Sequence, residues 1–276
     1  MSIKQYINIP DNPPNLLIIA GPCRVGTTAL ANTFAKAGIN VYMQPIKSVR
    51  RAIEDADRVI PWDISEEEGS FVVSKETLGP KTPAEFFNPI QILLEAGYPK
   101  DKLYFMPIVR DPRKALPSWR QMWDSVDQNK FLESYNLTLE IKDYAESNAI
   151  KTIPYVHEVI RDQNPDNVIY ALFSKLNLQE KLAQNLSHWG TDYQFAKKDS
   201  VDSHCKFYDV PPERFIKDVR EWGGYQFKEE PELFLSQEDA LFLKNHQELK
   251  KIYEIFRREC QESLDLKIQP YDALNY

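Results

Sequence analysis

The chain has 276 residues and a formal net charge of −7, and 42% of its residues are apolar and 27% charged. This composition fits a globular protein with one large domain or two small ones. The acidic balance argues against a general nucleic-acid binder, because such proteins are usually basic. No apolar run approaches the roughly 20 residues needed to span a bilayer.

The cysteines and the N-terminus indicate the compartment. Three cysteines, far apart in the sequence, are typical of a reducing environment rather than of a disulfide framework. The N-terminus lacks the apolar region of a signal peptide, so we expect a cytoplasmic protein. The four histidines and three cysteines lack the close spacing of metal ligands, so we expect no bound metal.

Strand and helix patterns alternate along the chain after a proline-rich lead-in, residues 1–14. Strands are predicted at residues 16–20, 39–43, 71–74, 103–109 and 152–156. Helices are predicted at residues 29–37, 45–58, 83–97, 112–124, 131–149, 165–176, 178–188 and 236–260, and an irregular segment at 190–210. The alternation favours a three-layer α/β fold with a central parallel sheet of about five strands. We expect a largely helical second half and one domain over residues 1–276.

The stretch from Gly21 to Thr28 reads Gly-Pro-Cys-Arg-Val-Gly-Thr-Thr and lies between a predicted strand and a predicted helix. This arrangement can hold a phosphate, because glycines let the backbone approach the anion and the helix start offers free N–H groups. It indicates a fold like that of the P-loop NTPases. The loop of those enzymes carries a lysine where this chain has Thr27, and the cation, Arg24, comes three residues earlier. We therefore expect a phosphate-bearing ligand other than a standard nucleoside triphosphate.

A second motif, Arg110-Asp111-Pro112-Arg113, follows the fourth predicted strand, and Ser118 lies eight residues after its first arginine. The two motifs, in this order and about 85 residues apart, resemble those of the sulfotransferases that use 3′-phosphoadenosine 5′-phosphosulfate (PAPS). The resemblance is clear over roughly residues 15–120. It implies that the first loop holds the 5′-phosphosulfate and that the second motif holds the 3′-phosphate.

The resemblance also implies, position by position, which residues bind PAPS and its product, adenosine 3′,5′-bisphosphate. They are Gly21, Cys23, Arg24, Val25, Gly26, Thr27, Thr28, Arg110 and Ser118. Val25 departs from the family, where serine is usual, and this loses a hydroxyl but keeps the backbone cradle. Arginine suits a phosphate, because its guanidinium fork matches the anion and stays charged. The family does not need Mg²⁺, which agrees with the missing loop lysine.

A third element, Lys75-Glu76-Thr77, follows the third predicted strand at the edge of the sheet where ligands bind in such folds. Cytosolic sulfotransferases often have a lysine followed two residues later by a catalytic histidine. Lys75 matches that lysine, but Thr77 stands in place of the histidine. We expect Glu76 to accept the proton of the acceptor, and Arg24 and Lys75 to stabilise charge on the leaving phosphate oxygen.

The predicted function is the transfer of a sulfuryl group from PAPS to a hydroxyl or amine of a small-molecule, lipid or carbohydrate acceptor. The sequence does not identify that acceptor, and it leaves a homodimer open. His157 and His204 are alternatives to Glu76 as the base. One alternative function is a small-molecule kinase with a degenerate phosphate loop and Asp111 as its magnesium ligand. Another is a non-catalytic nucleotide-binding module.

Overall fold

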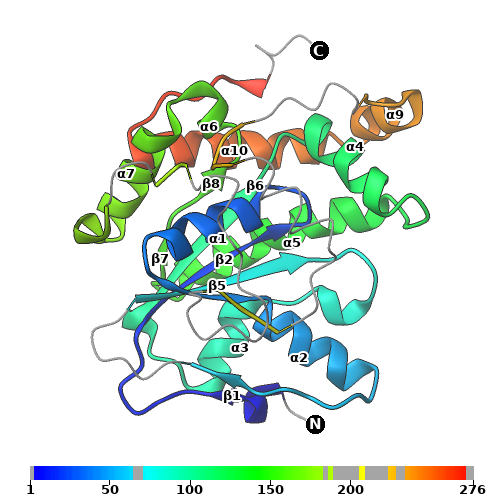
Figure 1. The fold of residues 1–276 in the computed structure, drawn as a ribbon. Coiled ribbons are helices and arrows are strands. Elements are labelled where there is room, and N and C mark those ends of the chain that lie inside the picture. Colours follow the sequence, from blue (N-terminus) through cyan, green and yellow to red (C-terminus); the bar gives the residue numbers. More distant parts are fainter. Residues whose placement is uncertain are drawn as a thin grey trace.

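The computed structural model describes residues 3–64, 71–182, 186–188, 205–208, 223–227 and 234–271. Its centre is a seven-stranded sheet in the order β7-β6-β2-β5-β3-β9, with β8 also paired to β6 (Figure 1). All of its strand pairs are parallel. The strands are β2 (Asn15–Pro22), β3 (Asn40–Met43), β5 (Phe71–Leu78), β6 (Leu103–Val109), β7 (Lys151–Thr152), β8 (Tyr155–Val156) and β9 (Cys205–Phe207). The predicted α/β fold with a parallel sheet is confirmed.

Helices lie on both faces of the sheet, and the C-terminal part is the more helical (Figure 1). They are α1 (Thr27–Lys36), α2 (Pro45–Glu54), α3 (Pro89–Ala96), α4 (Pro112–Met122), α5 (Asn129–Ser147), α6 (Val159–Asp162), α7 (Pro165–Lys175), α9 (Gln237–Asn245) and α10 (Gln247–Leu264). In the described part of the chain, no helix is long and apolar enough to cross a membrane. The lead-in contributes one strand, β1 (Ile7–Asn8), to a second sheet. This strand pairs in parallel with β4 (Trp62–Asp63).

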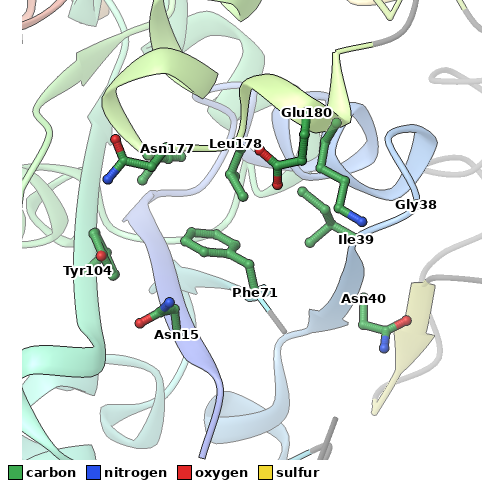
Figure 2. Close-up of a pocket in the computed structure, with 11 residues that line it drawn as sticks. Asn15, Gly38, Ile39, Asn40, Phe71, Tyr104, Asn177, Leu178 and Glu180 are labelled. Carbon is green, nitrogen blue, oxygen red and sulfur yellow. The ribbon is translucent and has the colours of Figure 1, made fainter. Parts of the chain in front are cut away.

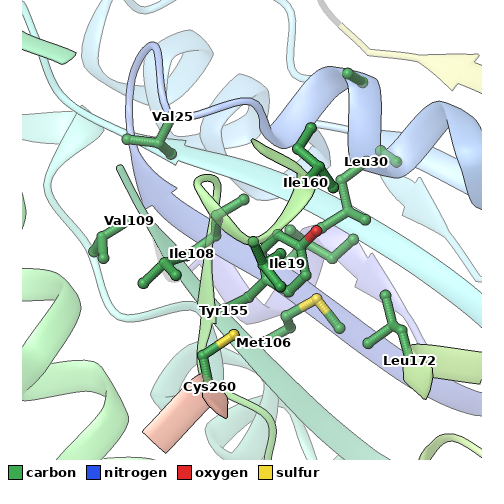
Figure 3. Packing of buried hydrophobic residues seen from close by; sticks show 14 of the residues in the cluster. Ile19, Val25, Leu30, Met106, Ile108, Val109, Tyr155, Ile160, Leu172 and Cys260 are labelled. Atoms are coloured by element: carbon green, nitrogen blue, oxygen red, sulfur yellow. The ribbon is translucent and has the colours of Figure 1, made fainter. Parts of the chain in front are cut away.

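The central strand β2 is buried on both faces, as expected for a parallel sheet covered by helices. Its side chains alternate between two cores, because successive residues of a strand point to opposite faces. Leu17 and Ile19 belong to a core with α1, α7 and α10, part of which Figure 3 shows. Leu16 and Ile18 belong to a second core with α2, α3 and α5.

The strand order creates a switch point at the middle of the sheet. From β2 the chain continues to β3 and β5 on one side, and it then crosses to β6, the other neighbour of β2. Ligands of open α/β sheets bind at the carboxyl ends of the strands at such a point. The loop after β2 carries Arg24, and β6 is followed by Arg110, so the topology places both predicted motifs at the switch point.

Several predicted elements were wrong in detail. The helix predicted at 178–188 is a short 3-10 turn, Gln179–Lys181, within the described residues. The helix predicted at 236–260 is two helices that break at His246, whose ψ of 66° is not helical. The strand predicted at 152–156 is divided into β7 and β8 around Pro154, which has no N–H to donate. β9 lies in the segment predicted to be irregular, 190–210, of which residues 190–204 and 209–210 lie outside the described residues.

Candidate phosphate-binding site

The turn between β2 and α1 has the backbone geometry of an anion site. Arg24 and Gly26 both have positive φ values, of 72° and 87°. No described side chain caps the start of α1, at Gly26. The first N–H groups of a helix have no partner within the helix, so those from Thr27 and Thr28 remain available to an anion at the positive end of the helix dipole.

The two glycines of this loop are required by their surroundings as well. A Cβ atom at Gly21 would lie 1.9 Å from the carbonyl oxygen of Ile108 on the neighbouring strand β6. A Cβ atom at Gly26 would lie 2.5 Å from Nδ1 of His157. The His157 ring therefore packs directly on the loop, a contact that the sequence pattern did not predict.

A hydrogen bond joins the two predicted motifs. Nε of Arg24 donates to Oγ of Ser118 over 2.9 Å, although the two residues are 94 positions apart in the sequence. Ser118 is fully buried on α4, and Arg24 is half-buried. The structure thus brings together the loop after β2 and the helix after β6, as the resemblance implies.

Arg110 is the second cation of this region, and it is more than nine-tenths buried at the end of β6. Its Nε has no hydrogen-bond partner among the described residues, and the same holds for Nδ1 of His157 and Oε2 of Glu158. A buried polar atom without a partner costs about 1–3 kcal/mol. Three such atoms lie in the residues that follow β6 and β8, and a bound polar group or water would satisfy each of them.

The protonation states around Arg110 follow from burial and charge. Burial, and then the nearby Arg110 guanidinium, lower the pKa of His157 to about 3, so its imidazole is neutral at physiological pH. Burial and the carboxylate of Asp111 raise the pKa of Glu158 to about 7. Oε1 of Glu158 accepts a hydrogen bond from the backbone N–H of Asp111. Arg110 thus lies beside a neutral imidazole and a carboxyl group that titrates near neutral pH.

Lys75 points to the face of the sheet that α1 covers. In the strand register it lies beside Ile19 and Met43, which both belong to the α1-side core. Only 4% of its surface is exposed, and its ammonium group forms no hydrogen bond or ion pair with a described residue. Burial lowers the pKa of Lys75 to about 8.

Glu76 points to the opposite face, where it caps α2. Its Oε1 and Oε2 accept hydrogen bonds from the backbone N–H groups of Ile46 and Lys47, over 2.9 and 3.3 Å. The side chain has no exposed surface. Burial raises the pKa of Glu76 to about 7, although the two N–H groups act in the other direction. The role of Glu76 as a base stays a prediction. In the structure its carboxylate also binds the first N–H groups of α2.

Cys23 and Val25 are buried parts of the loop, and Thr77 lies beside the start of α2. Cys23 is buried, and its thiol donates to the carbonyl oxygen of Gly79 over 3.4 Å. Val25 stands where the family usually has serine. Its side chain is fully buried, as suits an apolar residue without a hydroxyl. The Thr77 hydroxyl donates to the side chain of Gln44 and accepts from Lys47, so it supports the start of α2.

The carboxylate of Asp111, the magnesium ligand of the alternative kinase function, is already engaged. It accepts the backbone N–H of Arg113 and thereby caps α4. It also forms a bidentate ion pair with the Arg113 guanidinium, at 2.7 Å for the shorter contact. This arrangement argues against a free metal ligand at that position.

Comparisons of the chain with protein-family models, with curated proteins and with solved structures found no match. The candidate site therefore depends on the residues themselves. Sequence reasoning missed the packing of His157 on Gly26 and the buried Lys47 beside Thr77, because both contacts join segments that only the fold brings together. His204, the second alternative base, lies outside the described residues.

Proposed function

We propose that this chain binds PAPS and transfers its sulfuryl group to a hydroxyl or amine of an acceptor. The hydrogen bond between Arg24 and Ser118 carries the proposal, since it unites two motifs whose resemblance is to the two phosphate-binding segments of PAPS-dependent sulfotransferases. The residues fit such a ligand in two further ways. The loop around Gly26 leaves the first N–H groups of α1 open, and the buried Arg110 has an Nε without a described partner.

The residues of the chain have distinct tasks in this proposal. When bound, PAPS supplies an activated sulfuryl group, whose bond to the 5′-phosphate breaks as the acceptor atom bonds to sulfur and the acceptor's proton passes to Glu76. The start of α1 and Arg24 hold the 5′-phosphate side, and Arg110 with Ser118 holds the 3′-phosphate. Lys75, on the α1 side of the sheet, offsets negative charge on the leaving phosphate oxygen.

Turnover of PAPS by the wild-type chain and by Arg24→Ala tests the catalytic part of the proposal. Removal of one donor that stabilises a developing charge typically lowers the rate by about 10²–10³-fold. We expect a loss of this size for Arg24→Ala, measured as sulfation of a panel of hydroxyl and amine acceptors. Full activity in the variant would remove Arg24 from the mechanism.

Thermal shift with two ligands separates the proposal from its alternatives. Adenosine 3′,5′-bisphosphate at 100 times its Kd should stabilise the protein by about 2.7 kcal/mol. Stabilisation by ATP–Mg²⁺ and not by the bisphosphate would refute PAPS binding and favour a kinase. Stabilisation by the bisphosphate without turnover of any acceptor would indicate a non-catalytic nucleotide-binding module.

A further inference from the structure

A cavity of about 240 Å³ lies at the amino ends of the strands, the edge of the sheet opposite the phosphate loop (Figure 2). Asn15, Phe71 and Tyr104 line it from the starts of β2, β5 and β6, and Asn15 is the register partner of Phe71. The turn that follows α7 lines its other side. β2 has 8 residues, so about 26 Å of strand separates this cavity from the loop that carries Arg24. The proposed reaction makes no use of it.

Three polar side chains of the cavity have spare hydrogen-bonding capacity. The amides of Asn15 and Asn177 and the carboxylate of Glu180 form no hydrogen bond with any residue that the structure describes, and Asn177 and Glu180 are exposed at the rim, where they bind water until a ligand replaces it. In Figure 2, Asn177, Leu178 and Glu180 lie above the Phe71 ring, Asn15 lies below it and Tyr104 lies to its left. An amide offers both donors and an acceptor, and a carboxylate offers acceptors only. The cavity is therefore lined with groups that can pair with a ligand that both donates and accepts.

The aromatic and charged groups narrow the class of ligand. The rings of Phe71 and Tyr104 lie 5.7 Å apart at an angle of 54°, so they form two inclined apolar walls and not a slot for a flat base. Glu180 and Lys181 have opposite charges and both line the cavity, so neither an anion nor a cation is favoured. A puckered ring with apolar C–H faces and hydroxyl groups at its edge fits these walls and these amides.

We propose that this cavity is a second binding site, for one ring of a neutral sugar. Its volume of about 240 Å³ is below the 300–1,000 Å³ typical of pockets for drug-sized ligands, which agrees with a single small ring. The C–H faces of the sugar would pack on Phe71 and Tyr104, and its hydroxyl groups would pair with Asn15, Asn177 and Glu180. A ring bound at this edge lies too far from the phosphate loop to receive a sulfuryl group. The site is therefore independent of the proposed transfer.

Ligand-observed saturation-transfer NMR on the full chain tests the site. The probes are the methyl glycosides of glucose, galactose and mannose, and N-acetylglucosamine, with adenosine and inorganic phosphate as counter-probes. We expect one of the sugars to bind with a Kd of about 1 mM, which is typical of a small ligand with few contacts. Adenosine and phosphate should not compete with it.

Two variants connect the signal to the cavity. Asn177 has a φ of 58°, so Asn177→Gly removes the amide while glycine keeps the left-handed backbone. Phe71→Leu removes one aromatic wall but keeps an apolar side chain against the core. Each should weaken sugar binding by about tenfold, the effect of losing one good contact. Tyr170→Leu is the control, because Tyr170 is 62% exposed on α7 and does not line the cavity.

Several results would overturn the proposal. Absence of saturation transfer from every sugar at tens of millimolar concentration would do so. Equal transfer in wild type, Asn177→Gly and Phe71→Leu would place any binding elsewhere. Preferential binding of adenosine or phosphate would show that the ligand class is wrong. None of these outcomes depends on whether PAPS is turned over.

Discussion

Gly26→Ala is the most direct test of the loop geometry, because it adds one methyl group at the start of α1. Gly26 has a φ of 87°, which alanine disfavours. The new carbon would also lie 2.5 Å from Nδ1 and 2.8 Å from Cε1 of His157. His157 is more than nine-tenths buried, so its ring has little room to move away. The substitution therefore combines backbone strain with a steric overlap.

The two contributions have separate magnitudes. A left-handed conformation costs a non-glycine residue about 1–2 kcal/mol, and overpacking a buried site costs about 1–3 kcal/mol. We expect Gly26→Ala to lower the free energy of unfolding by about 2–5 kcal/mol in total. In a His157→Ala background the overlap disappears, so Gly26→Ala should then cost only the backbone part. The difference between the two costs is the coupling energy of the pair.

Urea unfolding of the four proteins of this cycle measures the coupling, and calorimetric titration with adenosine 3′,5′-bisphosphate measures the ligand affinity. Gly97→Ala is a matched control, because Gly97 has a φ of 97° but a Cβ there would meet nothing within 4 Å. It should cost only about 1–2 kcal/mol of stability and leave the affinity unchanged. If Gly26→Ala costs no more than Gly97→Ala, the packing of His157 on the loop is refuted. If Gly26→Ala keeps wild-type affinity for the bisphosphate, this loop is not the binding site.

Two further predictions concern buried charges. Arg110→Gln removes a buried cation whose Nε has no described partner. We therefore expect the free energy of unfolding, measured in urea, to stay unchanged or to rise. Calorimetry should show at least tenfold weaker binding of adenosine 3′,5′-bisphosphate. A large loss of stability would instead indicate a structural role. The pKa of Glu76 is raised from 4.5 to about 7 in the folded protein, so its protonation stabilises the fold below pH 4.5, and this stability is lost as the pH rises to about 7. Urea unfolding at several pH values measures this dependence. In Glu76→Gln the free energy of unfolding should lose up to about 3 kcal/mol of its variation with pH. A plot of unfolding free energy against pH that runs parallel to that of the wild type would contradict the prediction.

The sequence alone was sufficient for the parallel sheet, apart from β9, and for the positions of the two motifs. The run from Leu16 to Ala20 is apolar without alternation, which is typical of a strand buried on both faces, and it became β2. Glycines and a cation between this strand and the next helix predicted the loop, and the Arg24–Ser118 hydrogen bond agrees with the pairing of the two motifs. Such features can be predicted from the sequence, because the residues that determine the backbone conformation are neighbours along the chain.

Contacts between distant segments were not readable in this way. The β9 strand pairs with β3 through residues more than 160 positions apart, and no pattern near Cys205 indicates that neighbour. His157 meets Gly26 only because β8 pairs with β6 and β6 with β2. The break at His246 coincides with a ring contact to Phe242 at 4.4 Å and a hydrogen bond to Glu248, neither of which the helical pattern contains.

The alternation of side chains along β5 constrains the proposed chemistry more than composition does. Lys75 and Glu76 are neighbours in a strand, so they face opposite sides of the sheet, with Lys75 toward α1 and Glu76 toward α2. If Glu76 is the base, the acceptor has to approach from the α2 side, where the backbone N–H groups of Ile46 and Lys47 already bind the carboxylate. The proton would then move onto a carboxylate that holds the first turn of α2. Proton transfer and the capping of that helix would be one event, because a protonated carboxyl group is a weaker acceptor for the N–H groups it now binds.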